Sequence, residues 1–196
     1  SLHFHTIYWP IFLMALDLPL PKKVFGHPWF NFGVEKMSKS RGNVIYADSL
    51  AERFSVDGVR YYALSEMPYA SDGSITYDTV IKRYNTDLVN NLGNLVKRTL
   101  DMQKKYFDKE VLAPTEPEAL DVELCDACVN AYNEYIANMD AYRIADAIDS
   151  VMTMLSRANK YIDETTPWTL AKDESKKARL ATVMYNLLEA LRVSLI

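Results

Sequence analysis

Residues 78–107 read DTVIKRYNTDLVNNLGNLVKRTLDMQKKYF, and this stretch decides the fold of the second half of the chain. Apolar side chains recur along it at helical spacing, at Leu88, Leu92, Leu95 and Val96, with polar residues between them. This pattern is typical of a long amphipathic helix that buries one stripe against other helices. The stretch therefore predicts a helical architecture that begins near residue 76.

Three segments further along the chain have the same periodicity. Residues 125–139, 141–164 and 174–196 are each long enough for a helix and carry an apolar stripe. Residues 110–123 contain two prolines, and this composition is typical of a linker. We therefore predict that residues 76–196 form an up-and-down helical bundle.

The first 75 residues have a different character, and we expect a small α/β part there within a chain that is mainly α. The apolar run FHTIYWPIFLMALDLPLP, residues 4–21, predicts a buried segment that is helical after Pro10. Residues 22–33 mix β-forming residues with glycine and proline, which favours a short strand and a turn.

Two short helices are expected next, before the bundle begins. Residues 47–67 have a helical pattern, with Asp48 as the candidate N-cap and a break at Asp57-Gly58. Residues 68–77 carry strong turn signals and predict a loop. The boundary between the two parts is therefore predicted between residues 75 and 76.

The composition limits the classes of function. Of the 196 residues, 49% are hydrophobic and 24% are charged, as in a globular protein with a sizeable core. The formal net charge of −4 excludes a global basic field, so a nucleic-acid partner has to be recognised by local basic sites. No apolar run is long enough to span a bilayer, so we expect no membrane partner.

The two cysteines, Cys125 and Cys128, have C-x-x-C spacing. A zinc site normally takes four ligands, and the sequence offers no second cysteine pair and no histidine nearby. The surrounding residues 123–135 also have a helical pattern, which places both thiols on roughly one face. We therefore expect two partly buried helical cysteines in a reducing cytoplasm, with no zinc or other metal site.

The segment EKMSKSRGNV, residues 35–44, has the composition of a functional loop and does not fit the face of a core element. Ammonium groups next to hydroxyls and free backbone N–H groups suit a polyphosphate. A glycine at position 42 lets the backbone approach a ligand closely. On chemistry alone, a solvated basic turn is the alternative interpretation.

The sequence KMSKS followed by RGNV resembles the second signature of class I aminoacyl-tRNA synthetases. In that family the loop clamps the ATP triphosphate and stabilises the departing pyrophosphate, which fits positioned ammonium groups near developing charge. The resemblance implies that Lys36, Met37, Ser38, Lys39 and Ser40 bind ATP with its Mg²⁺. Lys36 and Lys39 would be the catalytic phosphate contacts, with Lys39 acting on the transition state.

The segment FHTIYWP, residues 4–10, is similar to the methionyl branch of that family. There, an F-H pair followed by W-P helps to form the amino-acid pocket, which implies that His5 and Trp9 bind methionine. A broad indole face suits a flexible, polarizable thioether. Without the resemblance, a core histidine and a core tryptophan would be the preferred interpretation.

Two segments in the second half, NNLGNLVKRTL and ETTPWTLAK, resemble the anticodon-binding bundle of the same branch. The resemblance implies that Asn94, Arg98 and Trp168 recognise the CAU anticodon of tRNA(Met). Asn94 and Arg98 are four apart and share a helix face away from the apolar stripe, which is compatible with this role. Without the resemblance, a plain solvated helix face would be the preferred interpretation. We expect that face, with Asn91 beside it, to meet solvent or a ligand.

Trp168 follows Thr166 and Pro167, which suit a helix cap and a first turn. An indole at that position can be exposed for stacking on a base, and a core tryptophan is the alternative. The expected partner is therefore an anticodon stem-loop that contacts both the helix face and this indole.

The resemblance covers essentially the whole chain and implies a C-terminal portion of a longer synthetase, with the bundle truncated at its end. The first class I signature, a H-I-G-H-like sequence, and the zinc-bearing insertion of the family are absent. We therefore expect that the chain alone does not form methionyl-adenylate, because half of the ATP site is missing. Two other interpretations stay open: an RNA-binding module only, or a class I synthetase for another amino acid, such as cysteine or leucine.

Overall fold

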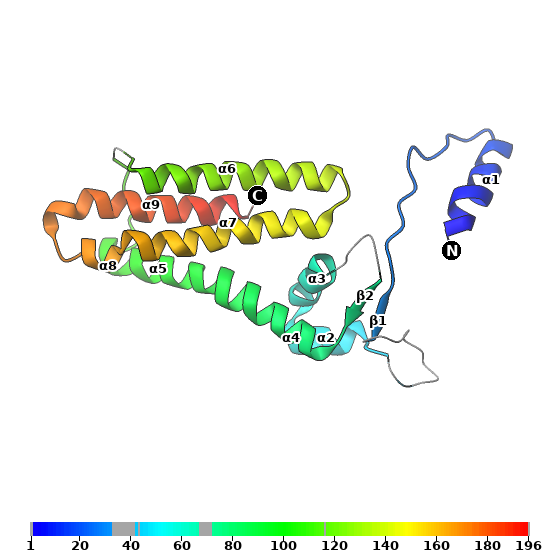
Figure 1. The fold of residues 1–196 in the computed structure, drawn as a ribbon, viewed down its shortest axis with the longest axis horizontal. Coiled ribbons are helices and arrows are strands. Elements are labelled where there is room, and N and C mark those ends of the chain that lie inside the picture. The colour runs from blue at the N-terminus through cyan, green and yellow to red at the C-terminus, as the bar shows by residue number, and fades with distance from the viewer. Residues whose placement is uncertain (1, 33–41, 43, 67–71, 116, 196) are drawn as a thin grey trace.

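The computed structural model describes residues 2–32, 42, 44–66, 72–115 and 117–195. Figure 1 shows an elongated molecule with long, roughly parallel helix axes at one end. Short helices and the strands occupy the middle, and the N-terminal helix stands apart at the other end (Figure 1). The mainly α fold with a small α/β part is confirmed.

The first half contains the π-helical turn η1 (Phe4–Tyr8), α1 (Trp9–Ala15), β1 (Phe30–Phe32), α2 (Ala47–Phe54), α3 (Val56–Ser65) and β2 (Gly73–Ile75). The second half contains α4 (Tyr77–Arg83), the π-helical segment η3 (Tyr84–Gly93), α5 (Asn94–Phe107), α6 (Ala119–Asp140), α7 (Ile144–Thr165), α8 (Pro167–Leu170), the 3₁₀ turn η4 (Glu174–Lys176) and α9 (Lys177–Val193).

The two strands form a small parallel sheet, in which Phe32 is paired with Ile75. The strand expected within residues 22–33 is confirmed, but the loop prediction for residues 68–77 was wrong in part because β2 lies there. A strand of three residues is too short to leave a periodic signal, and it exists here because a distant segment supplies its hydrogen bonds.

The helices of residues 47–65 differ in detail from the prediction. The break falls at Ser55, whose φ of 66° ends α2, and not at Asp57-Gly58. The Ser55 hydroxyl then caps α3 by accepting a hydrogen bond from the N–H of Gly58 at 3.2 Å. Tyr46, not Asp48, occupies the N-cap position of α2, and Asp48 lies in the first turn, where a carboxylate suits the helix dipole.

The N-terminal helix is exposed, so the prediction of a buried segment was wrong. No residue of η1 or α1 is buried, and Trp9 is 44% exposed. The reason is that no other described element packs extensively on this apolar helix, which Figure 1 shows apart from the bundle. The helix also begins before Pro10: Leu2 and His3 are already α-helical, η1 continues the helix from Phe4, and α1 follows from Trp9.

The long helix expected in residues 78–107 is confirmed as the continuous run of α4, η3 and α5 (Figure 1). It begins with a capping box, in which Thr76 and Thr79 each accept a hydrogen bond from the other's backbone N–H. It ends where Asp108 adopts a left-handed conformation with a φ of 47°. The helix therefore passes from the small α/β part into the bundle without a linker.

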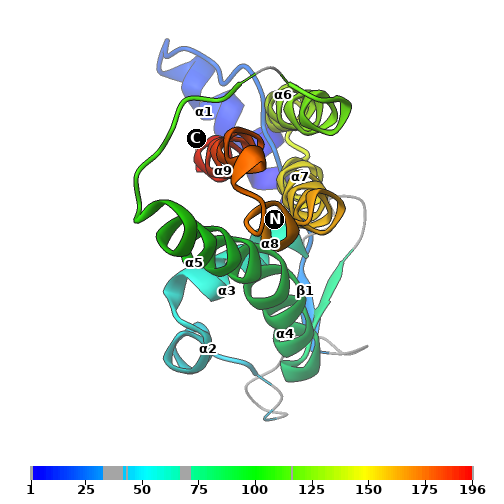
Figure 2. The ribbon, with the colours of Figure 1, turned by 90° about the vertical axis from the view of Figure 1, so that its left-hand side faces the viewer.

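The bundle core lies between α5, α6, α7 and α9, whose axes are seen nearly end-on in Figure 2. Its fully buried side chains include Leu95 from α5, Leu155 and Ile162 from α7, and Val183 and Leu187 from α9. Apolar residues three or four apart supply these contacts, as the periodicity predicts. Among the described helices, none has the length and apolar character needed to cross a membrane.

A buried polar cluster fastens α6 to α9. Asp121 is 5% exposed and accepts hydrogen bonds from Arg179 Nη1 at 2.6 Å and Nη2 at 3.1 Å. The Tyr161 hydroxyl and the backbone N–H of Glu118 also donate to Asp121. Burial alone would raise the pKa of Asp121, but these hydrogen bonds outweigh burial and leave it below its ordinary value.

Arg83 connects the two halves of the molecule. Its guanidinium lies 3.0 Å from Asp87 and 3.3 Å from Glu66, which follows α3. The same group lies 3.3 Å from Asp149 of α7. One cation therefore contacts the small α/β part, the long helix and the bundle.

Candidate functional site

A polar groove with a volume of about 540 Å³ runs between the long helix and α7. The long helix contributes Asn90, Asn91 and Asn94, and α7 contributes Ser156 and Asn159. Amide and hydroxyl groups of this kind both donate and accept hydrogen bonds, so the lining can recognise the edges of planar polar groups.

Asn94 and Arg98 lie in this groove, one turn apart on α5, as the spacing predicts. Asn94 is exposed, and its Nδ2 donates to Asn159 Oδ1 at 3.3 Å. Arg98 Nη2 donates to Asp163 Oδ1 at 2.7 Å, and the Asp163 side chain is 64% exposed. Both side chains therefore point along a surface that a ligand can reach, while α7 holds their orientation.

Asn91 is tied more firmly to α7. Its Nδ2 donates to the Met152 carbonyl and to Ser156 Oγ, both at 3.0 Å. Asn159 Nδ2 donates in return to the backbone carbonyl of Asn91 at 3.1 Å and to its Oδ1 at 3.0 Å. Asn91 was expected to face solvent or a ligand, and it lies in the groove with its amide engaged by its neighbours.

Trp168 lies on α8 directly after α7 and is 41% exposed. Pro167 is buried at the first position of that helix and anchors the turn. Thr166 occupies the N-cap position in a left-handed conformation with a φ of 43°, and its side chain makes no capping hydrogen bond. A large part of the indole therefore meets solvent, but Trp168 is not among the residues that line the polar groove.

His5 and Trp9 are brought together on the N-terminal helix. They line a hollow of about 340 Å³ with the aromatic rings of Phe4, Tyr8 and Phe12. The hollow is aromatic and open, which suits an apolar side chain. Figure 1 shows that this helix lies far from the long helices of the bundle.

The predicted phosphate-binding residues of the loop lie outside the part of the chain that the structure describes. They are Lys36, Met37, Ser38, Lys39 and Ser40.

Gly42, which belongs to the same 35–44 segment, is described, and its φ is +67°. Glycine adopts this left-handed conformation without the steric cost that a side chain brings.

Sequence reasoning did not identify the α7 side of the groove, namely Asp149, Asn159 and Asp163. A signal was present, because these residues recur on the polar side of α7 at intervals of helical turns. Their pairing with the long helix, at Arg83 of α4 and at Asn94 and Arg98 of α5, depends on how two helices pack across a separation of about 65 residues. Periodicity gives the face of a helix but not the neighbour that it meets.

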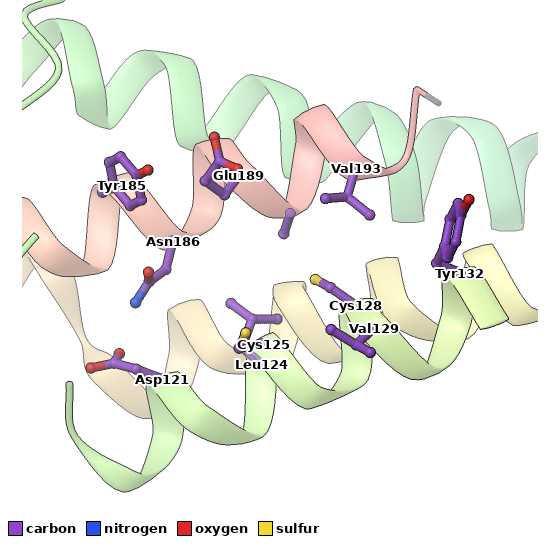
Figure 3. Close-up of a pocket in the computed structure, with 11 residues that line it drawn as sticks. Asp121, Leu124, Cys125, Cys128, Val129, Tyr132, Tyr185, Asn186, Glu189 and Val193 are labelled. Carbon is purple, nitrogen blue, oxygen red and sulfur yellow. The ribbon is translucent and has the colours of Figure 1, made fainter.

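A second, largely apolar pocket of about 450 Å³ lies between α6 and α9. Figure 3 shows Cys125 and Cys128 on its α6 side, opposite Asn186 and Glu189 of α9. Both cysteines lie on α6, as expected, but only Cys128 is partly buried; the prediction was wrong for Cys125, which is exposed because its side chain faces the open pocket. Burial, with smaller contributions from Cys125 and Glu189, raises the pKa of the Cys128 thiol to about 11.

This pKa predicts slow alkylation of Cys128. The thiolate is the reactive form, so at pH 8 iodoacetamide should modify Cys128 about a hundredfold more slowly than an ordinary thiol. Mass spectrometry of peptides from the native protein measures the rate, and the urea-unfolded chain provides the control. Equal rates for Cys128 in both states would contradict the raised pKa.

The family model for tRNA synthetases class I (M) matches residues 1–100. The methionine–tRNA ligase of Clostridium perfringens is 55% identical over 191 residues, which are 97% of this chain and 30% of that protein. The methionine–tRNA ligase of Caldanaerobacter subterraneus subsp. tengcongensis is 50% identical over 189 residues, 96% of this chain and 30% of that protein. The chain therefore spans about 30% of the length of the curated relatives it matches.

Solved structures extend the similarity to the arrangement of the elements. A Mycobacterium tuberculosis methionyl-tRNA synthetase in complex with methionyl-adenylate matches with a TM-score of 0.94 and 38% identity, over 98% of this chain and 38% of that chain. The apo form of the same enzyme matches with a TM-score of 0.88 and 34% identity, over the same shares of the two chains. Because the family model covers just over half of the chain and these relatives extend the match through the bundle, the chain belongs to the methionyl (M) family of class I tRNA synthetases.

Proposed function

We propose that this chain works within a methionine–tRNA ligase, which activates methionine with ATP and attaches it to tRNA(Met). In this proposal residues 76–196 form the anticodon-binding bundle, and the groove between the long helix and α7 reads the CAU anticodon. Residues 1–75 hold one edge of the catalytic domain. The observation that carries the proposal is the placement of Asn94 and Arg98 side by side in an open polar groove.

The geometry of the groove suits recognition of an unstacked base. The Asn94 amide can donate to and accept from a base edge, and the Arg98 guanidinium can stack on a base or pair with phosphate. Arg98 is paired with the exposed Asp163, and exposed ion pairs contribute only about 0–1 kcal/mol. RNA can therefore compete for the guanidinium at low cost, while Asp163 orients it beforehand.

Trp168 adds a stacking surface at the end of α7. Stacking of a base on an exposed aromatic ring contributes about 1–3 kcal/mol. Because the formal net charge of the chain is −4, nonspecific attraction to phosphate is weak, and these specific contacts dominate the affinity.

The catalytic part of the proposal rests on the first half of the chain. Lys36 and Lys39 would contact the ATP triphosphate, and Mg²⁺ would arrive on the phosphate oxygens of ATP. Among the described residues, no group of three or more His, Cys, Asp or Glu side chains is placed to hold a metal ion. His5 and Trp9 would contact the methionine side chain in the aromatic hollow of the N-terminal helix, and the cytoplasm is the proposed setting.

Binding of anticodon stem-loops tests the proposal directly. We expect the chain to bind a CAU stem-loop at least about tenfold more tightly than a stem-loop with a scrambled triplet. Alanine at Asn94, Arg98 or Trp168 should each weaken CAU binding by about 5- to 100-fold, because each variant removes one base contact. Fluorescence anisotropy at physiological salt measures these affinities.

Lys97→Ala is the matched control for these variants. Lys97 lies on α5 between Asn94 and Arg98, its side chain is 77% exposed, and it pairs with Asp101 outside the groove. Its replacement should leave the preference for CAU intact. Equal affinity of the unmodified chain for both stem-loops would refute the assignment of the groove.

A further inference from the structure

The long helix has an unusual hydrogen-bonding pattern where it passes the groove. Residues 84–93 form i→i+5 hydrogen bonds, and the N–H of Asn94 reaches the carbonyl of Val89. The dihedral angles are helical on both sides, with φ −64° and ψ −45° at Arg83 and φ −62° and ψ −45° at Asn94. The segment is therefore a π-helical insertion within an otherwise regular helix, a feature found frequently at functional sites.

Gly93 stands at the end of this insertion, and its dihedral angles do not require glycine. Its φ of −60° and ψ of −41° are those of any helical residue. A Cβ at this position would lie 2.9 Å from the backbone carbonyl oxygen of Leu88, five residues earlier. The wide turn brings that carbonyl close to the Cβ position, so a side chain there would push the backbone out of place.

Contacts from α7 fix the angular position of the π-helical turn. The Asn91 side chain donates to the Met152 carbonyl and to Ser156 Oγ, both at 3.0 Å. Asn159 donates to the backbone carbonyl of Asn91 at 3.1 Å and to its side-chain oxygen at 3.0 Å. These bonds hold one orientation of Asn91 about the helix axis and would break if the helix rotated.

The register of the turn determines which residues share the groove. An i→i+5 turn holds one residue more than an α-turn, and one residue corresponds to a rotation of about 100°. If the turn became α-helical without loss of a residue, Arg83 and Asp87 would rotate away from the face that carries Asn94 and Arg98. In the structure all four of these residues line the same groove.

We propose that Gly93 is a positioning residue, which permits the π-helical turn and so sets the register of the groove between the long helix and α7. The role as a positioning residue for anticodon recognition rests on the function proposed above. The π-helical turn also sets how the small α/β part is rotated about the long helix relative to the bundle. The reason is that α4 is the first part of the long helix and also packs in the core of the small α/β part.

Gly93→Ala tests the proposal on the full chain. In an ordinary helix this substitution would raise Tm by about 2–4 °C, because alanine is the better helix former. Here we expect Tm to fall by about 4 °C or more, since the new Cβ meets a backbone carbonyl. We also expect the side-chain amide NMR resonances of Asn91 and Asn159 to move, whereas those of Asn133 on α6 stay.

Two further variants make the test decisive. Val89→Ala, at an exposed position of the same turn that already has a Cβ, is the control and should leave the resonances of Asn91 and Asn159 unchanged. Deletion of Val89 together with Gly93→Ala converts the turn from Leu88 to residue 93 into an α-turn and keeps both flanks in phase. This double variant should recover the Tm that Gly93→Ala loses and return the amide resonances of Asn91 and Asn159 toward their original positions.

The outcomes separate this proposal from the proposed function. A rise in Tm for Gly93→Ala with unmoved resonances would overturn the proposed role of Gly93 in setting the register. It would not count against the proposal that the groove binds the anticodon. If Gly93→Ala does not fold, the double variant decides: a folded double variant supports the proposal and an unfolded one overturns it. An unmodified chain without preference for CAU would refute the proposed function, while the Tm and NMR results would still report on the register.

Discussion

Replacing Lys39 by alanine in a full-length synthetase that contains this chain is expected to slow methionine-dependent ATP–pyrophosphate exchange by about 10²–10³-fold. The reason is that charge develops on the departing pyrophosphate, and a positioned ammonium group stabilises the transition state more than bound ATP. The effect should therefore appear mainly in kcat, with a smaller change in the KM for ATP.

The same protein provides the controls for Lys39→Ala. Its affinity for the CAU stem-loop should be unchanged, whereas Asn94→Ala should weaken RNA binding and leave pyrophosphate exchange intact. If Lys39→Ala retained full exchange activity, the phosphate role of the loop would be wrong, and an RNA-binding module would be the better interpretation. Exchange that depends on cysteine or leucine in place of methionine would point to another class I enzyme.

Replacing Asp121 by alanine should destabilise the bundle by about 3–5 kcal/mol, because it leaves the partly buried Arg179 guanidinium with only the exposed Glu118 carboxylate, 3.0 Å from its Nε, as a partner. The side chain of Asp121 is 4% exposed and that of Arg179 15% exposed, so water replaces the lost hydrogen bonds only in part. Urea unfolding monitored by circular dichroism measures the loss. Asp146→Ala is the control, because its ion pair with Arg143 is exposed and its loss should cost less than about 1 kcal/mol.

The pH dependence of stability should report the same cluster. The folded-state pKa of Asp121 is lowered, so its contribution to stability is complete above the unfolded-state value of about 3.9. That contribution is lost as the pH falls through the lower folded-state pKa. Asp121→Asn should remove this part of the acid sensitivity, and an unchanged acid-unfolding curve would contradict it.

The helical part of the fold was predictable because local periodicity determines it. The stripe that contains Leu95 predicted the long helix, and the spacing of Asn94 and Arg98 predicted their shared face. The partners of those two residues were not predictable, because Asn159 and Asp163 meet them only through helix packing. The sequence thus identified one wall of the candidate site, and the tertiary structure supplied the other.

The errors also have physical causes. An apolar segment such as residues 4–21 predicts burial because apolar surface avoids water, but burial requires a partner that the described part of this chain does not provide. The π-helical turn at residues 84–93 was not visible either, since an insertion of this kind barely changes the apolar pattern. The residue in the sequence that marks this turn is Gly93, and its proposed role follows only from the distance between a Cβ placed there and a backbone carbonyl oxygen.

The long helix also affects how the protein can be divided for biophysical work. Val80 of α4 packs in the small core with Leu50, Tyr62 and Ile75, although it lies beyond the boundary proposed after residue 75. A recombinant N-terminal piece that stops there would lack this core residue, whereas a C-terminal piece that starts after Thr76 would lose its capping box. Overlapping pieces that both retain residues 76–83 avoid the two defects, because that segment supplies Val80 to the small core and the capping box to the helix that enters the bundle.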